Sequence, residues 1–265
     1  MKTSRLSVNL QIIIFTVIVS VAAFLSNSVF LFLALRPNNI THWTMLWTLM
    51  THVFVHANFF HLFVNMFSLW FLGNVVESII GRKRFIWFYC LSGVFAGIVA
   101  SLLAGFFGYG IGESIFGSPD VYMVGASGAI FGLVGLLAML IPRKKVYLIL
   151  GPIVAILIQF VISELPVNQN LLSVISVVIN VYIIFSLFAI ISFNPRFRKF
   201  ALPVEMPLWL LPIVSIVPLI LIGLFISLPI GNFAHLGGLI AGLGYGFYLK
   251  QKYKNKVTAL QRYFR

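Results

Sequence analysis

The chain contains 265 residues, of which 61% are hydrophobic and only 9% are charged. Ordinary globular domains are about 25% charged, so this chain has too few ionisable side chains to cover a water-soluble surface. These figures disfavour a soluble enzyme, a nucleic-acid-binding module and a disordered tail. The formal net charge of +13 arises from basic residues in short clusters between long apolar runs. That pattern is typical of membrane topology, and we expect the lipid bilayer, not a nucleic acid, as the partner.

Eight apolar stretches are long enough to cross a hydrocarbon core of about 30 Å, which takes roughly 17 to 25 helical residues. The first is too long for a signal peptide, and no small-x-small cleavage site precedes Arg36, so we expect a retained first helix. The predicted transmembrane helices are, in chain order, residues 11–35, 53–80, 85–108, 124–141, 146–163, 171–192, 208–229 and 233–250.

The charges in the connections alternate between the two sides of the membrane. Of all the basic residues, only Arg36 falls on the side that also carries the acidic residues Glu113, Asp120 and Glu164. The positive-inside rule therefore predicts a multi-pass protein of the cell membrane with both termini in the cytoplasm. The clusters on the cytoplasmic side are Lys2 and Arg5, Arg82 to Arg84, Arg143 to Lys145, Arg196 to Lys199, and the basic residues from Lys250 to Arg265.

Two outer connections, residues 36–52 and 109–123, are longer and more polar than the basic turns, and they are expected to roof a cavity. The tail, residues 251–265, is a basic cytoplasmic segment whose simplest role is to hold the last helix against anionic lipid.

Polar residues within a span are costly, and four of them stand out. His61 and Asn65 are four residues apart in the second span and therefore share one helical face. Ser127 lies at the outer start of the fourth span, and His235 opens the eighth. Counted at 1.5 Å per residue, Ser127, His235 and Asn65 lie roughly 22 to 26 Å above the basic residues at the inner ends of their spans, and His61 lies one turn higher. The four are thus predicted to share one layer in the outer half of the bilayer.

Glycines indicate how the helices that carry these residues approach each other. Gly128 and Gly132, like Gly238 and Gly242, form small-xxx-small pairs that let two helix backbones come close. His235 lies on the same face as Gly238 and Gly242, so its ring projects into that contact. A serine hydroxyl beside an imidazole there is an activated nucleophile.

Three motifs on three predicted helices resemble, in their type and chain order, those of the rhomboid intramembrane serine proteases. They are Gly125-Ala-Ser127-Gly128, His235 with Gly238 and Gly242, and His56-xxxx-His61-xxx-Asn65 followed by Gly73 and Glu77-xxx-Gly81. The resemblance covers about residues 45–145 and 203–250. It implies an all-α polytopic fold, and an endopeptidase that cleaves transmembrane segments of other membrane proteins without a cofactor or metal.

The resemblance also implies a role for each matching residue. Ser127 is the nucleophile and His235 the general base of a dyad without an acid partner. His61 and Asn65 match the groups that bind the oxyanion, together with the backbone N–H of Ser127. The remaining matches are supporting residues: Gly125 allows a close approach, Phe131 packs against the catalytic imidazole, and His56 is mainly structural, as are Gly128, Gly238 and Gly242.

This chain departs from the family pattern in two ways. Met45-Leu-Trp47-Thr48 stands where relatives often carry Glu-x-Trp-Arg, so the arginine that anchors the first outer loop is replaced by Thr48. Three spans, instead of one, separate the serine and histidine helices. We therefore expect a single rhomboid-like domain with a six-helix core, about residues 11–145 and 203–250, and an inserted helix pair at about residues 146–199.

Other interpretations remain open. Taken singly, Ser127 favours a packing role, and His61 and Asn65 favour interhelical hydrogen bonds. A non-catalytic rhomboid relative that binds membrane clients is one alternative. A small transporter is another, although no charged residue lies deep in a span. His52 and His56 lack the glutamate of the zinc-protease signature, and the single cysteine, Cys90, permits neither a disulfide nor a cysteine zinc site.

Overall fold

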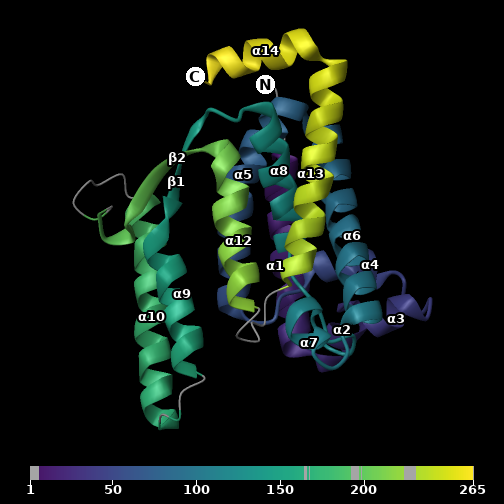
Figure 1. Cartoon of the computed structure of the whole chain (residues 1–265), viewed down its shortest axis with the longest axis vertical. Helices are drawn as coiled ribbons and strands as arrows, with labels where there is room; N and C mark the ends of the chain where they lie inside the picture. Colours follow the sequence, from purple (N-terminus) through teal and green to yellow (C-terminus); the bar gives the residue numbers. More distant parts are fainter. Residues whose placement is uncertain are drawn as a thin grey trace. The chain divides into compact units, whose positions relative to one another are not determined.

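The computed structural model of the chain describes residues 6–163, 166, 168–191, 197, 199–223 and 231–264. Its contacts divide the chain into two units: unit 1 is Met1–Arg143 with Trp209–Arg265, and unit 2 is Lys144–Leu208. Helices dominate the described residues (Figure 1), which confirms the all-α class of a multi-pass membrane protein. Four described helices are long and apolar enough to span a bilayer: Val8–Leu25, Phe59–Ile80, Arg82–Phe107 and Gln169–Ala189.

The first predicted span is broken in two. Helix α1 covers Val8–Leu25 and helix α2 covers Asn27–Leu33, so the single helix expected over residues 11–35 was wrong at Ser26. Ser26 has an extended backbone, and its hydroxyl accepts a hydrogen bond from the N–H of Val29. A serine cap of this kind starts a new helix within an otherwise continuous apolar run.

The connection after α2 contains two short helices, α3 (Pro37–Thr41) and α4 (Thr48–Thr51), and the 3-10 turn η1 (His52–Phe54). In place of the missing arginine contact, the Trp47 indole Nε1 donates to the Phe32 carbonyl at 2.9 Å, and the two rings pack 5.2 Å apart. Thr48 is fully buried, and its hydroxyl donates to the Met45 carbonyl at 2.7 Å. These contacts anchor the loop without the family arginine.

The two long connections that were predicted to lie outside are joined to each other. Leu35 and Met123 exchange backbone hydrogen bonds of 3.1 and 2.6 Å, and the Arg36 guanidinium contacts the Asp120 carboxylate at 2.7 Å. Helix α7 (Gly112–Phe116) lies in the second connection. The first loop is therefore held against the chain that leads into Ser127.

Three long helices follow in unit 1. Helix α5 (Phe59–Ile80) begins later than expected because Asn58 caps it through the N–H of His61. Helix α6 covers Arg82–Phe107, and helix α8 covers Ser127–Leu140. Helix α8 contacts α5, α6, α12 (Leu211–Gly223) and α13 (Asn232–Lys252) (Figure 1). Most of its residues are buried. A helix that is apolar all round belongs in the core of a bundle, and α8 forms that core.

The closest helix pair in unit 1 is α8 with α13. A β-carbon at Gly238 would collide with the backbone carbonyl of Gly128, and one at Gly242 with the carbonyl of Gly132. The two helices therefore meet backbone to backbone, which only glycines at these positions allow.

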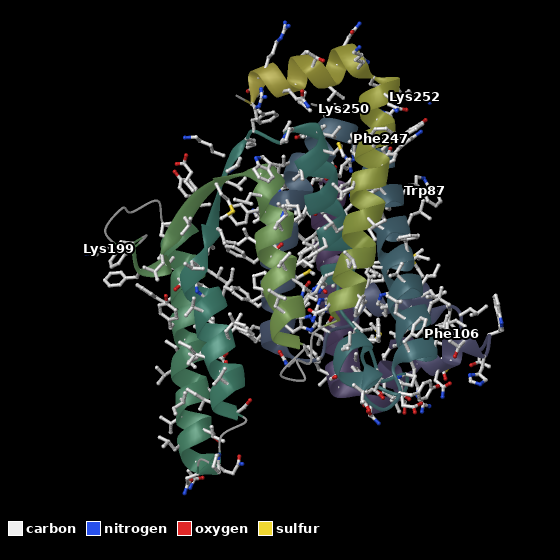
Figure 2. The ribbon with its side chains drawn as sticks, in the orientation of Figure 1. Trp87, Phe106, Lys199, Phe247, Lys250 and Lys252 are labelled. Carbon is white, nitrogen blue, oxygen red and sulfur yellow. The ribbon has the colours of Figure 1, made fainter. Side chains whose placement is uncertain are left out.

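The basic tail continues as helix α14 (Lys254–Tyr263), which packs against the bundle through the buried side chain of Val257. Figure 2 shows Lys250 and Lys252 at the same end of unit 1 as Trp87, with Phe106 toward the opposite end of α6. Of the predicted seventh span, residues 224–229 lie outside the described residues. The same holds for several charges used in the topology argument: Lys2, Arg5, Glu164, Arg196, Arg198 and Arg265.

Unit 2 contains helix α9 (Leu150–Ser163), helix α10 (Gln169–Ile191), the 3-10 turn η2 (Lys199–Ala201) and two strands. The 3-10 turn η3 (Leu208–Leu210) begins at its boundary. Residues 146–149 were expected to be helical, and this was wrong. They belong to strand β1 (Lys145–Ile149), which pairs antiparallel with β2 (Pro203–Pro207). The Lys145 ammonium contacts the Glu205 carboxylate at 2.6 Å across the ribbon. That unit 2 is an insertion into a six-helix core stays a prediction.

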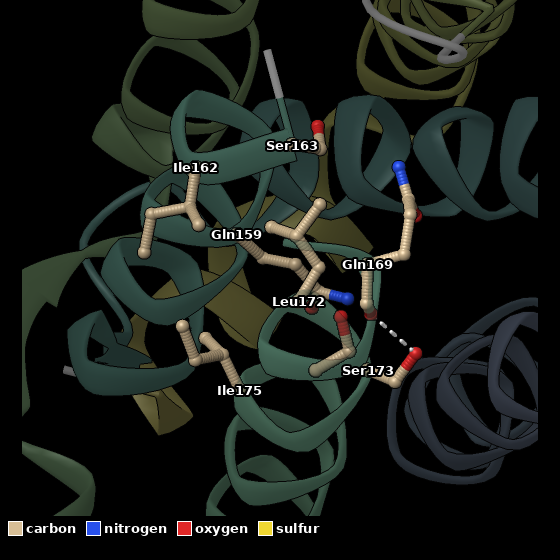
Figure 3. A pocket seen from close by; sticks show the side chains of 8 residues that line it. Gln159, Ile162, Ser163, Gln169, Leu172, Ser173 and Ile175 are labelled. Atoms are coloured by element: carbon tan, nitrogen blue, oxygen red, sulfur yellow. Dashed lines mark hydrogen bonds between the residues drawn. The ribbon is translucent and has the colours of Figure 1, made fainter. Parts of the chain in front are cut away.

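A pocket lies between the two helices of unit 2 (Figure 3). Gln159 of α9 and Gln169 and Ser173 of α10 contribute polar groups to its lining, and the Ser173 hydroxyl donates to the Gln169 carbonyl at 2.9 Å. Polar side chains between apolar helices are typical of interhelical contacts in membranes.

Candidate active site

Ser127 and His235 come together where α8 and α13 begin. Ser127 is the first residue of α8, and His235 lies in the first turn of α13. The Ser127 hydroxyl oxygen is 2.8 Å from Nε2 of His235, a hydrogen-bond distance across 108 residues of sequence. Ser127 is half-buried, whereas His235 is only 8% exposed. The hydroxyl of Ser127 is therefore accessible, whereas the imidazole of His235 is enclosed.

The imidazole of His235 is held by an aromatic ring and not by a carboxylate. Phe131, one turn after Ser127 on α8, stacks on it with ring centroids 4.5 Å apart and an interplanar angle of 20°. Among the described residues, Nδ1 of His235 is buried and has no hydrogen-bond partner. For Nε2 to accept the serine proton, Nδ1 must carry the ring hydrogen. The plane of the ring is held by its stacking with Phe131.

Gly125 brings His61 against the loop that precedes Ser127. Its φ angle is +125°, which side chains other than glycine rarely adopt. A β-carbon at this position would lie 2.8 Å from Cε1 and 3.0 Å from Nε2 of His61. The histidine ring therefore lies directly over the Gly125 backbone, two residues before Ser127.

Two histidines of the connection between α2 and α5 hold the backbone of this segment. The backbone carbonyl of His52 accepts the N–H of Gly125 at 3.0 Å, and Nε2 of His56 accepts the N–H of Ala126 at 3.3 Å. His56 is completely buried, and its ring packs edge-on against His61 with centroids 5.0 Å apart. His56 thus joins the two groups on either side of the loop.

A serine of α1 completes this arrangement. The Ser20 hydroxyl donates to the Phe54 carbonyl at 3.0 Å and lies 3.0 Å from Nδ1 of His56. Since the only hydrogen of Ser20 Oγ is used by Phe54, His56 must donate from Nδ1. Nε2 is then free of hydrogen and able to accept the N–H of Ala126. Ser20 was not identified from the sequence, because a single hydroxyl in an apolar span gives no signal of a partner 36 residues away.

Asn65 lies one turn after His61 on α5 and is 5% exposed. Its amide nitrogen donates to the His61 carbonyl at 2.8 Å. An amide nitrogen carries two hydrogens, so one remains for a second acceptor. Ser127, His235, His61, Gly125, Phe131 and His56 thus form one connected cluster, with Asn65 attached to it through the His61 carbonyl.

Known proteins support the resemblance in sequence. A family model described as the Rhomboid domain matches residues 43–180 and 182–252. RHOMBOID-like protein 1 of Arabidopsis thaliana is 34% identical over 115 residues, which cover 43% of this chain and 26% of that protein. The putative rhomboid protease YdcA of Bacillus subtilis is 35% identical over 89 residues, covering 34% of this chain and 38% of that protein.

The rhomboid protease GluP of Bacillus subtilis is 31% identical over 103 residues, which cover 38% of this chain and 17% of that protein. In each of these three cases the alignment spans less than half of the relative's own length. The family model, in contrast, matches most of this chain, including the helices that carry Ser127 and His235. The chain belongs to the rhomboid family.

Proposed function

We propose that this protein is an intramembrane serine endopeptidase that cleaves peptide bonds in or near transmembrane segments of other membrane proteins. The observation that carries the proposal is the 2.8 Å contact between Ser127 Oγ and His235 Nε2 at the start of two packed helices. Family membership supports a protease-like function, and the contact supplies the pair of groups that such a reaction needs.

The proposed chemistry begins with Ser127. Its Oγ attacks the carbonyl carbon of the scissile bond as its proton moves to Nε2 of His235, and the carbonyl oxygen becomes an oxyanion. When the C–N bond breaks, the imidazolium gives that proton to the leaving amine, and the acyl group stays on Ser127. Water then attacks the ester, again with His235 as base, which releases the acid and restores the serine. Positioned general-base catalysis contributes about 10²- to 10⁴-fold to the rate.

The oxyanion requires hydrogen-bond donors beside Ser127. We assign this role to the backbone N–H of Ser127, the ring of His61 and the free amide hydrogen of Asn65. The position of His61 over Gly125 supports the assignment. The start of α8 at Ser127 also directs the positive end of the helix dipole toward the forming charge. One such side-chain donor is worth about 10²- to 10³-fold in turnover.

The orientation in the membrane belongs to the same proposal. Figure 2 shows Lys250 and Lys252 at one end of unit 1. Helix α6 begins at Arg82, and Arg84 donates to the hydroxyl of Tyr253, the residue after Lys252. This gathering of basic residues supports a cytoplasmic location for that end. His235 lies near the opposite end of α13 from Lys250. We therefore place the dyad in the outer half of the bilayer and both termini in the cytoplasm.

The direct test is cleavage of a helical transmembrane substrate in liposomes by wild type and by Ser127→Ala. Wild type is expected to cleave and Ser127→Ala to be inactive, whereas Ser114→Ala, which changes an exposed serine of α7, retains activity. Equal cleavage by wild type and Ser127→Ala would refute the proposal. Binding of the substrate without cleavage by wild type would favour the non-catalytic client-binding alternative.

A further inference from the structure

The junction of α13 and α14 forms a groove that is distinct from the serine and histidine cluster. It has a volume of about 230 Å³. Its apolar wall comes from the ends of three long helices, α5, α8 and α13, and from the inner face of α14. The lining residues are Ile79, Ile80, Arg84, Leu140, Leu249, Tyr253, Lys256, Val257 and Leu260.

Three cations surround one aromatic ring at the edge of this groove. The Arg84 guanidinium lies 5.2 Å from the centroid of the Tyr253 ring and donates to its hydroxyl at 3.1 Å. The ammonium groups of Lys252 and Lys256 lie 5.8 and 5.9 Å from the same centroid, and that of Lys252 also donates to the Tyr248 hydroxyl at 2.7 Å. These charges come from α6, α13 and α14, so the fold itself gathers them.

No carboxylate among the described residues forms an ion pair with Arg84, Lys252 or Lys256. Three like charges around one ring repel each other, and the ring quadrupole offsets only part of this repulsion. An anion at this position would lower the electrostatic free energy and would accept hydrogen bonds from guanidinium and ammonium groups. The charge arrangement therefore favours an anionic group bound here.

The remainder of the groove fixes the class of ligand. Ile80, Leu140 and Leu249 stand at or near the ends of membrane-embedded helices, where headgroups meet acyl chains. Inorganic phosphate has no apolar surface to bury against this wall, whereas a phospholipid has both a phosphate and an acyl chain. We propose that the groove binds one anionic phospholipid, with its phosphate at Arg84 and Lys256, the two cations that line the groove, and an acyl chain against the apolar wall.

This site explains why α14 remains on the bundle although only Val257 among its residues is buried. The helix is amphipathic, with Val257 and Leu260 facing the groove and Lys254, Lys256 and Arg262 among its polar residues. A lipid bound between α14 and α6 joins the two elements through their shared anion. The bound lipid takes no part in the catalytic chemistry, and one lipid binds to each protein chain.

The test is native mass spectrometry of the protein released from micelles that contain equal amounts of phosphatidylglycerol and phosphatidylcholine with identical acyl chains. Wild type is expected to retain one phosphatidylglycerol in preference to phosphatidylcholine. The double variant Arg84→Gln/Lys256→Gln should weaken this retention by roughly tenfold or more. Circular dichroism establishes that the variants keep their helical content.

The matched control is Lys83→Gln/Lys250→Gln, which removes the same charge at the same end of unit 1 but does not line the groove. It should retain phosphatidylglycerol within about twofold of wild type, because the global charge term is nearly the same. Equal losses in both double variants would show a diffuse surface attraction and overturn the site. Displacement of the phosphatidylglycerol by millimolar inorganic phosphate would also overturn the lipid as its occupant.

Discussion

Ser20 on the first helix and His56 in the connection between α2 and α5 are joined by a 3.0 Å hydrogen bond between the hydroxyl oxygen and Nδ1. The other ring nitrogen of His56 accepts the N–H of Ala126, the residue before Ser127. The first helix is thereby coupled to the backbone that leads into Ser127, through a single histidine whose tautomer is set by its two partners. We therefore expect Ser20 to act as a positioning residue.

Replacement of Ser20 by alanine removes the partner of His56 Nδ1 and leaves a buried donor unsatisfied. We expect the free energy of unfolding to fall by about 1 to 3 kcal/mol and kcat to decrease with little change in KM. The measurements are thermal unfolding and steady-state cleavage. Ser78→Ala, at an exposed position of α5, is the control and should change neither. A Ser20→Ala enzyme with wild-type kcat would remove the positioning role.

Two glycines of α13 are expected to respond in opposite ways to alanine. A β-carbon at Gly238 meets the Gly128 carbonyl, whereas one at Gly244 meets nothing within 4 Å. Gly238→Ala should therefore push α13 away from α8, lower the midpoint of thermal unfolding and abolish activity. Gly244→Ala should be neutral or stabilise by up to about 1 kcal/mol, because alanine favours a helix. Equal effects of the two substitutions would contradict the backbone contact.

Asn65→Ala tests the proposed oxyanion donor. Because one amide hydrogen is used by the His61 carbonyl, the substitution removes both that bond and the donor assigned to the reaction. We expect kcat to fall by about 10²-fold, while the unfolding midpoint changes little. Labelling by a fluorophosphonate should remain detectable but slow. A variant with unchanged kcat would exclude Asn65 from the oxyanion site.

Glu77 should act on the stability of α1 rather than on chemistry. Its two carboxylate oxygens accept the backbone N–H groups of Val8 and Asn9 at 2.9 and 2.8 Å, and Arg82 lies 3.9 Å away. Glu77→Gln retains one acceptor oxygen and loses the charge at the helix start, which we expect to cost about 1 kcal/mol. Hydrogen exchange of Val8 and Asn9 should accelerate. The control is Glu113→Gln, at an exposed acidic residue of α7. In this variant, hydrogen exchange of Val8 and Asn9 should stay as slow as in wild type.

The pH dependence of cleavage should show a loss of activity on the acid side. His235 can accept the serine proton only when its imidazole is neutral. We therefore expect kcat/KM to reach its full value at pH values above the pKa of this imidazole and to decrease as the pH falls below that pKa. His235→Gln should have no such acid limb in its residual rate. An unchanged acid limb in that variant would mean that another group controls the profile.

Much of the arrangement could be predicted from local spacing. Helical rise places Ser127 and His235 at similar depth, and the glycines of α8 and α13 predict their close contact. The break at Ser26 was missed because the hydropathy of the run is continuous and the cap depends on one hydroxyl. Strand β1 was missed because its partner lies about sixty residues away and an apolar run of this length fits a helix equally well.

The measurement that most directly tests the central claim is the site of reaction with a fluorophosphonate, mapped by mass spectrometry of peptides from wild type and from His235→Ala. The 2.8 Å contact leads us to expect a covalent adduct on Ser127 in wild type and labelling reduced by at least about 10²-fold in His235→Ala. An adduct on another residue, or equal labelling of Ser127 in both proteins, would contradict the proposed dyad.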